Sequence, residues 1–158
     1  MERKKIIQTI TLNALILALY YVFSLSLGQL NYGIINIRIS EVFILLAMFN
    51  KKFIPGLVGG CLLVNIFSGL PFDWLIGTGQ TLIACLILYF IKNRYISLFL
   101  AALSCGVIIG VELHFFVNEP LWLAMGSVLL SELIILTIGY FIWKAALKNS
   151  AIQRLILE

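Results

Sequence analysis

Charged residues are scarce in this chain, since Asp, Glu, Lys and Arg make up only 11% of its 158 residues. Soluble domains carry about a quarter. The chain has one histidine and three cysteines, and no CxxC spacing occurs, which argues against a metal centre or a redox site. The HExxH and GxSxG patterns and a phosphate-binding glycine loop are also missing. We therefore expect a protein that is not an enzyme and needs no metal or cofactor.

Apolar residues dominate instead, at 62% of the chain, and the mean hydropathy is +1.09. This composition predicts an all-α integral membrane protein with a single domain, residues 1–158. Apolar runs bounded by charge or by Pro and Gly predict six transmembrane helices. The predicted spans cover about residues 6–27, 38–49, 53–68, 74–91, 95–117 and 121–145. The second helix is short, because a straight span needs about 20 residues.

The basic residues lie at alternate ends of these spans. They precede the first span, separate the second from the third and the fourth from the fifth, and follow the sixth. The positive-inside rule then places both termini in the cytoplasm, with ten of the eleven Lys and Arg inside and only Arg38 outside. The first apolar run is long for a signal peptide, so we interpret it as a retained span. The net charge of +4 reflects topology and does not indicate nucleic-acid binding.

The acidic residues show the opposite bias. Glu41, Asp73 and Glu112 fall at or near the outer ends of the spans, and Glu132 lies deeper. A carboxylate-lined outer mouth would attract a cation. Glu132 lies roughly 18 Å along the last helix, where a carboxylate costs about 2.5–3.5 kcal/mol. We therefore expect Glu132 to be protonated, to be paired with an amide of another span, or to face a cavity.

Other polar residues allow two interpretations each. Arg38 and Glu41 share a helical face, so they form an ion pair, or Arg38 orients Glu41 in a pocket. Asn65 makes an interhelical hydrogen bond or supplies an amide to a ligand. Asp73 directly precedes a predicted helix, which favours an N-cap, while a role in lining the pocket stays open.

Aromatic residues accompany the acids. Glu112 shares a face with Phe115, one turn later, and Trp74 follows Asp73 near the outer interface. A carboxylate beside aromatic rings suits a flat, nitrogen-rich ligand, because the acid accepts N–H bonds and the rings stack. The alternative is an aromatic packing face with a carboxylate turned to water.

Pairs of small residues four apart occur on two predicted spans, as Ala14 with Ala18 and as Gly106 with Gly110. Such faces let helices approach closely. Within one small protein they pack internally more often than against a partner.

Several of these residues fall in a pattern that resembles the QueT-type membrane proteins. The matching segments extend over most of the chain, from about residue 32 to 145. They are Tyr32–Glu41, Ile54–Leu62, the set Asn65, Gly69 and Asp73, and the later pieces Gly110–Leu113 and Ser131–Ile134.

The resemblance implies a substrate-binding S-component of a bacterial energy-coupling factor (ECF) transporter. Such a subunit would lie in the plasma membrane and capture a queuosine precursor, a 7-deazaguanine such as 7-aminomethyl-7-deazaguanine. A T-component and two cytoplasmic ATPases would be its partners. Ala14 and Ala18 match the Ala-x-x-x-Ala face that contacts the T-component in this family, and the loop 28–36 would form an extracellular lid.

The residue chemistry agrees with such a ligand. The pyrimidine edge of a deazaguanine presents N–H donors to a carboxylate, its flat face suits an aromatic ring, and its cationic aminomethyl group requires a second acid. We expect Arg38 to orient a substrate site made of Glu41, Asn65, Asp73, Trp74, Glu112, Phe115 and Glu132.

Three alternatives remain from the sequence. The chain is an ECF S-component for another small heterocycle or vitamin, or a stand-alone proton-coupled carrier that uses Glu132 as its relay, or an assembly protein of the membrane without a ligand.

Overall fold

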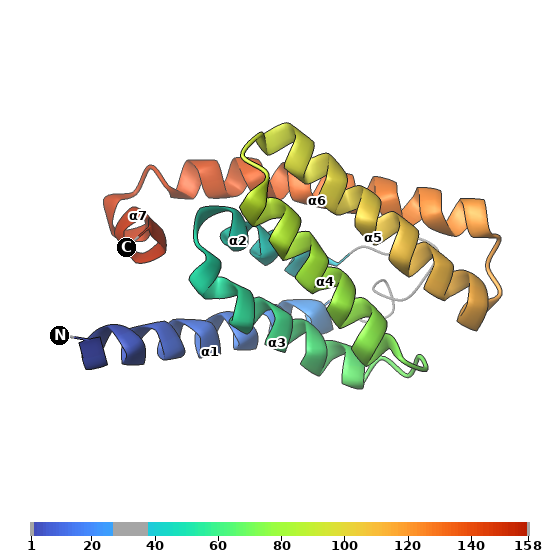
Figure 1. The fold of residues 1–158 in the computed structure, drawn as a ribbon, viewed down its shortest axis with the longest axis horizontal. Coiled ribbons are helices and arrows are strands. Elements are labelled where there is room, and N and C mark those ends of the chain that lie inside the picture. Colours follow the sequence, from blue (N-terminus) through green and yellow to red (C-terminus); the bar gives the residue numbers. More distant parts are fainter. Residues whose placement is uncertain (1, 27–37, 158) are drawn as a thin grey trace.

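The computed structural model describes residues 2–26 and 38–157, and these residues form helices and connecting turns without a strand (Figure 1). The predicted lid at 28–36 lies outside the described residues. The elements in chain order are α1 (Glu2–Ser26), η2 (Ile39–Leu45), α2 (Leu46–Phe49), η3 (Lys51–Phe53), α3 (Ile54–Ile66), α4 (Asp73–Phe90), α5 (Arg94–Val117), α6 (Leu121–Ala146) and α7 (Ser150–Leu157).

Within the described residues, four helices are long and apolar enough to cross a membrane. They are Ile6–Ser26, Asp73–Phe90, Arg94–Val117 and Leu121–Ala146. The other two predicted spans are helical but shorter, namely Ile39–Phe49 and the 13-residue α3. Most of Ile39–Phe49 is wound as a 3-10 helix, which hydropathy does not distinguish from an α-helix. Non-standard backbone is tolerated at membrane depth where protein surrounds it.

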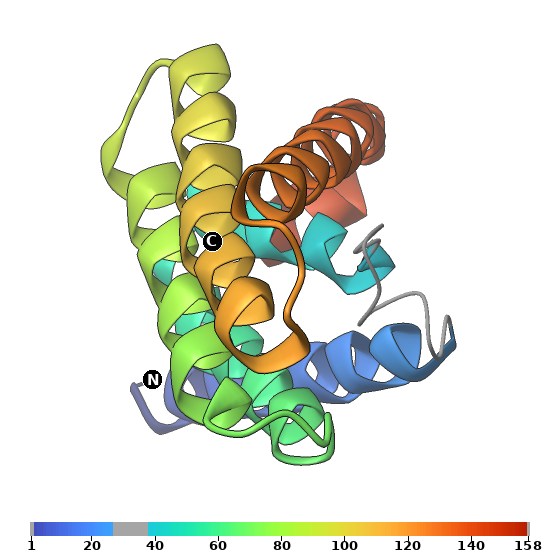
Figure 2. The ribbon, with the colours of Figure 1, turned by 90° about the vertical axis from the view of Figure 1, so that its right-hand side faces the viewer.

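Neighbouring helices in the chain pack side by side in one bundle. α1 contacts α3, α3 contacts α4, α4 contacts α5, and α5 contacts α6. The 3-10 helix η2 contacts both α6 and α1, and Figure 2 shows this short segment between them. The polar side chains of η2 therefore face the middle of the bundle.

Glycines set the distance between α1 and α3. A Cβ atom on Gly56 would lie 2.6 Å from the carbonyl oxygen of Asn13, and one on Gly60 would lie 2.8 Å from Cβ of Tyr20. Asn13 also accepts a hydrogen bond from the Gly56 amide (2.6 Å) and donates one to the carbonyl of Lys52 (2.8 Å). The two glycines, one turn apart, permit this close approach.

The predicted close packing at Gly106 and Gly110 is confirmed. A Cβ atom on Gly110 would lie 2.6 Å from Cα of Met125 on α6, and one on Gly106 would lie 2.7 Å from Cβ of Leu129. The small face of α5 thus packs internally, against the first half of α6.

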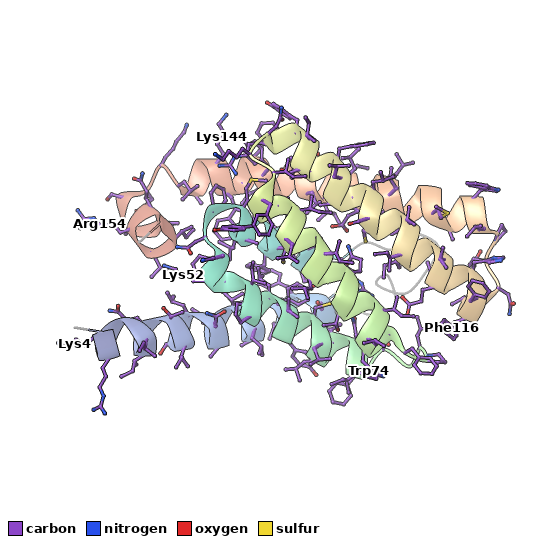
Figure 3. All side chains as sticks on the ribbon, viewed as in Figure 1. Lys4, Lys52, Trp74, Phe116, Lys144 and Arg154 are labelled. Carbon is purple, nitrogen blue, oxygen red and sulfur yellow. The ribbon has the colours of Figure 1, made fainter. Side chains whose placement is uncertain are left out.

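The two ends of the bundle differ in character. Both termini lie at one end, together with the labelled side chains of Lys4, Lys52 and Arg154 (Figure 3). Trp74 and Phe116 lie toward the opposite end, which we call the far end (Figure 3). The position of these three cations beside the termini agrees with the alternation of charge along the sequence.

The helix α7 is an element that hydropathy does not predict, because it is short and amphipathic. Ile156 is buried against the core, and its carbonyl accepts a hydrogen bond from Nδ2 of Asn50 (3.2 Å). Nζ of Lys52 donates to the carbonyl of Leu155 (3.2 Å). α7 is therefore tied to the turn between α2 and α3.

The three cysteines are free and buried, as expected for thiols in apolar runs. Cys61 lies on α3 with Sγ 3.0 Å from Oγ1 of Thr81. Cys85 and Cys105 belong to the packed faces of α4 and α5.

Candidate functional site

Polar groups from every long helix, from α3 and from η2 are buried within the bundle. Five of them are of ionisable types that carry charge in water, one cation and four acids: Arg38, Glu41, Asp73, Glu112 and Glu132. The others are uncharged: Ser24, Ser40, Asn65, Gln80, Thr81 and Ser97, together with Tyr20. Such groups are costly in an apolar interior unless they are paired or used.

Arg38 is the centre of the charged groups. It is only 7% exposed, and its Nη1 donates to Oδ1 of Asn65 at 3.5 Å. Its guanidinium is close enough to interact electrostatically with Glu41 and Asp73. It interacts in the same way with Glu112 and Glu132. One guanidinium group thus interacts with four carboxyl groups, so the cluster contains more acidic than basic side chains.

Tyr20 fixes the position of Glu41. Its hydroxyl is fully buried and donates to Oε1 of Glu41 at 2.7 Å. Beside this bond, Oγ of Ser24 donates to Oγ of Ser40 at 2.7 Å, so α1 holds η2 at two successive residues. Oε2 of Glu41 is buried and has no hydrogen-bond partner among the described residues. Half of this carboxylate is therefore available to a ligand.

Asn65 is engaged on both sides of its amide. Its oxygen accepts from Arg38, and its Nδ2 donates to Sγ of Cys61 (3.2 Å) and to Oγ1 of Thr78 (3.5 Å). The bond to Thr78 on α4 is the interhelical bond that one interpretation predicted, whereas Cys61 lies on the same helix as Asn65. A direct ligand contact by Asn65 stays a prediction.

The N-cap prediction for Asp73 is wrong. The cap of α4 is Phe72, in the left-handed conformation with φ 64°, and no side chain caps this end. The backbone N–H groups of Leu75 and Ile76 donate to the Phe72 carbonyl instead (2.8 and 2.9 Å). Asp73 is the first residue of α4, only 1% exposed, and neither of its oxygens has a hydrogen-bond partner in the described part of the chain.

The Asp73 carboxylate lies over Gly77 on its own helix. A Cβ atom on Gly77 would lie 2.5 Å from Oδ1 of Asp73 and 2.5 Å from Nδ2 of Asn65. This glycine therefore leaves the space that the two polar side chains occupy. Neither Gly77 nor Tyr20 was predicted, since each lies in an apolar run without a recognisable motif.

Glu112 lies across from α4 at the far end of the bundle. It is 3% exposed, and its Oε1 has no partner among the residues that the structure describes. It is close enough to Asp73 for electrostatic interaction. Glu112 also lines a groove of about 580 Å³, whose other walls are apolar: Ile76, Val107, Ile108, Val111, Phe115 and Phe116.

Glu132 lies within α6 and is 4% exposed. It interacts electrostatically with Glu41 and Arg38. No hydrogen bond joins it to a described residue. The two amides considered as its alternative partners are bonded to other groups, Asn65 to Arg38, Cys61 and Thr78, and Gln80 to Thr81. Glu132 thus lies on the buried face of α6, near the charged cluster.

The predicted stacking and partner residues lie at the surface. Trp74 is 49% exposed and Phe115 is 73% exposed, so neither ring reaches the buried cluster, although Phe115 borders the groove at Glu112. Ala14 and Ala18 are both exposed on α1 and do not pack within the described bundle. Their small face is available to another molecule.

These features define a helical, multi-pass membrane protein with a buried, acid-rich site. Comparison with known proteins gives its family. The model of the QueT transporter family matches residues 10–148. The chain is also 30% identical to the "Queuosine precursor transporter QueT" of Lactococcus lactis subsp. cremoris (strain MG1363), over 90% of this chain and 93% of that protein. No solved structure matched the chain.

The chain therefore belongs to the QueT transporter family. It is a transport protein and not an enzyme.

Proposed function

We propose that this chain is the substrate-binding S-component of an ECF importer. It captures a queuosine precursor, 7-aminomethyl-7-deazaguanine or a related deazapurine, from outside the cell. A T-component and two cytoplasmic ATPases then drive delivery of the base to the cytoplasm.

The observation that carries this proposal is a buried group of carboxyl oxygens that have no hydrogen-bond partner among the described residues. These oxygens belong to Glu41, Asp73 and Glu112. All three side chains are close enough to Arg38 to interact with it electrostatically. Leaving a buried acceptor unpaired costs about 1–3 kcal/mol, and more for a charged group. A flat base rich in N–H donors would remove that cost on binding. The proposed substrate site comprises Glu41, Asn65, Asp73, Trp74, Glu112, Phe115 and Glu132, with Arg38 as the orienting residue.

Six membrane crossings with both termini in the cytoplasm fit this role. Lys4, Lys52 and Arg154 lie at the same end as the termini (Figure 3), which supports that orientation under the positive-inside rule. The far end, with Asp73 and Glu112, would then face the outside. The short second span and the lid at 28–36 would border the site.

Binding to the purified chain tests the proposal. We expect saturable binding of 7-aminomethyl-7-deazaguanine, measured by isothermal titration calorimetry in detergent, and its loss in Glu132→Ala with expression unchanged. The reason is that Glu132 is buried in α6 and interacts electrostatically with Glu41 and Arg38 of the proposed site. Failure of every deazapurine to bind the folded wild-type chain would refute the proposal.

Reconstitution in vesicles separates the rival mechanisms. Uptake that requires ATP, the T-component and both ATPases supports the S-component. Uptake by this chain alone, driven by a proton gradient, would instead make it a carrier with Glu132 as the relay.

A further inference from the structure

We propose that Asp73 and Glu112 form a cation subsite that holds the ammonium group of the substrate, separate from the position where Glu41 receives the ring edge. This inference rests on the proposed function and assigns one part of the ligand to one part of the site.

The first support is the state of Asp73. A carboxylate at the first residue of a helix normally serves as a cap or faces water. Here the Phe72 carbonyl accepts hydrogen bonds from the N–H groups of Leu75 and Ile76. The Asp73 side chain does not face water, because this residue is only 1% exposed. Its side chain is turned inward, over Gly77 and toward Asn65. The capping role is thus filled by the backbone, and the acid is left for another purpose.

The second support is the pairing with Glu112. Two carboxylates that interact electrostatically in a buried place repel each other unless a cation joins them. Together they present three buried oxygens that lack a partner in the described ranges 2–26 and 38–157: both of Asp73 and Oε1 of Glu112. An ammonium group has three N–H donors. The donors of such a group therefore match the unpaired acceptors in number.

The third support is the surroundings. Rings of Phe72 and Phe116 lie 6.3 Å apart and connect the far ends of α4 and α5 beside the acids. Apolar groups of the groove, including Ile76, lie next to Glu112. Low polarity around the acids strengthens their attraction for a cation. Arg38 also interacts electrostatically with Asp73 and Glu112, but it is a single cation among four buried acids, so we assign a second positive charge to the ligand.

Glu41 lies in a different environment. One of its oxygens accepts from the Tyr20 hydroxyl, and the other has no hydrogen-bond partner in the part of the chain that the structure describes. This arrangement suits one or two N–H donors of a neutral ring edge. Asp73 and Glu112 thus select a cationic group, whereas Glu41 selects the neutral N–H donors of the ring edge.

A pair of ligands that differ only in the ammonium group tests the subsite. The probes are 7-aminomethyl-7-deazaguanine and 7-methyl-7-deazaguanine, in which the ammonium group is absent. We expect the wild-type chain to bind the aminomethyl base at least tenfold more tightly. Asp73→Asn and Glu112→Gln should each weaken its binding by about tenfold to a hundredfold, as for a lost charge-assisted hydrogen bond. Binding of the methyl base should change less than about threefold.

Glu119→Gln is the matched control, because this acid lies just beyond α5 and is only half-buried. It should leave both affinities unchanged. Equal loss of both ligands in Asp73→Asn and Glu112→Gln would overturn the subsite and indicate a structural role.

Two further outcomes are decisive even where a variant does not fold. If the wild-type chain binds both bases equally, the subsite is wrong and the proposed function stands. If it binds neither base, the proposed function itself fails.

Discussion

Tyr20 shows how one hydroxyl fixes the position of a buried acid. Its bond to Oε1 of Glu41 leaves Oε2 as the oxygen with spare capacity. A hydrogen bond to a charged group contributes about 1.5–3 kcal/mol. Positioning of this kind is invisible in the sequence, because Tyr20 lies among apolar residues 21 positions from its partner.

We expect Tyr20→Phe to lower the affinity for the aminomethyl and the methyl base by about tenfold each. The loss should be equal because Glu41 receives the ring edge that both bases share. The thermal midpoint should also fall, since Glu41 loses its hydrogen bond. Calorimetric titration and a melting curve in detergent check both effects.

Tyr21→Phe provides the control, since Tyr21 is half-buried and packs against the core. It should bind both bases like the wild type. A selective loss of the aminomethyl base in Tyr20→Phe would contradict the assignment of Glu41 to the ring edge.

At the scale of elements, packing between helices depends on where glycine leaves room. Gly110 lies against the backbone of Met125, whereas Gly126 on the facing helix has open space where a Cβ would lie. The same substitution therefore has opposite consequences on the two helices.

We expect Gly110→Ala to destabilise the bundle by about 1–3 kcal/mol through overpacking of α5 against α6. Gly126→Ala should be neutral or stabilise it by up to about 1 kcal/mol, because alanine favours a helix. The thermal midpoints of both variants give the comparison. Equal midpoints would show that α6 shifts freely to accommodate the methyl group.

Hydropathy and charge predict the helical segments well, because an apolar run between charged turns has few alternatives in a membrane. The same signals do not report how a segment is wound, so the 3-10 geometry of η2 was missed. They also miss α7, whose apolar residues alternate with polar ones over only eight positions.

The acids of the candidate site were predicted because a carboxylate in apolar sequence is conspicuous. Their states were not, since these depend on hydrogen-bond partners and on a backbone conformation that the sequence does not report. Asp73 illustrates this point: the sequence favours a cap, and only the left-handed Phe72 reveals that the backbone carbonyl takes that role.

At the scale of the whole molecule, the exposed face of α1 is the surface on which assembly is proposed. Ala14 and Ala18 face outward, and Ile7 and Ile10 on the same helix are each 62% exposed. Small side chains here permit a second helix to approach closely.

We expect the double variant Ala14→Phe and Ala18→Phe to keep its affinity for the base within about twofold, because α1 holds Glu41 from its other face. Bulky rings should block a close helix contact, so co-purification with the T-component and ATP-dependent uptake should be lost. Ile134→Phe, on the exposed side of α6, is the control and should support uptake. Normal assembly of the double variant would place the partner elsewhere.

The burial of Cys61, Cys85 and Cys105 has a practical consequence for spectroscopy. Maleimide reagents and spin labels attack thiolates that they can reach, and none of these three sulfur atoms lies at the surface. A label attached to a newly introduced surface cysteine would therefore give a signal from that position alone. The native cysteines would not have to be replaced first.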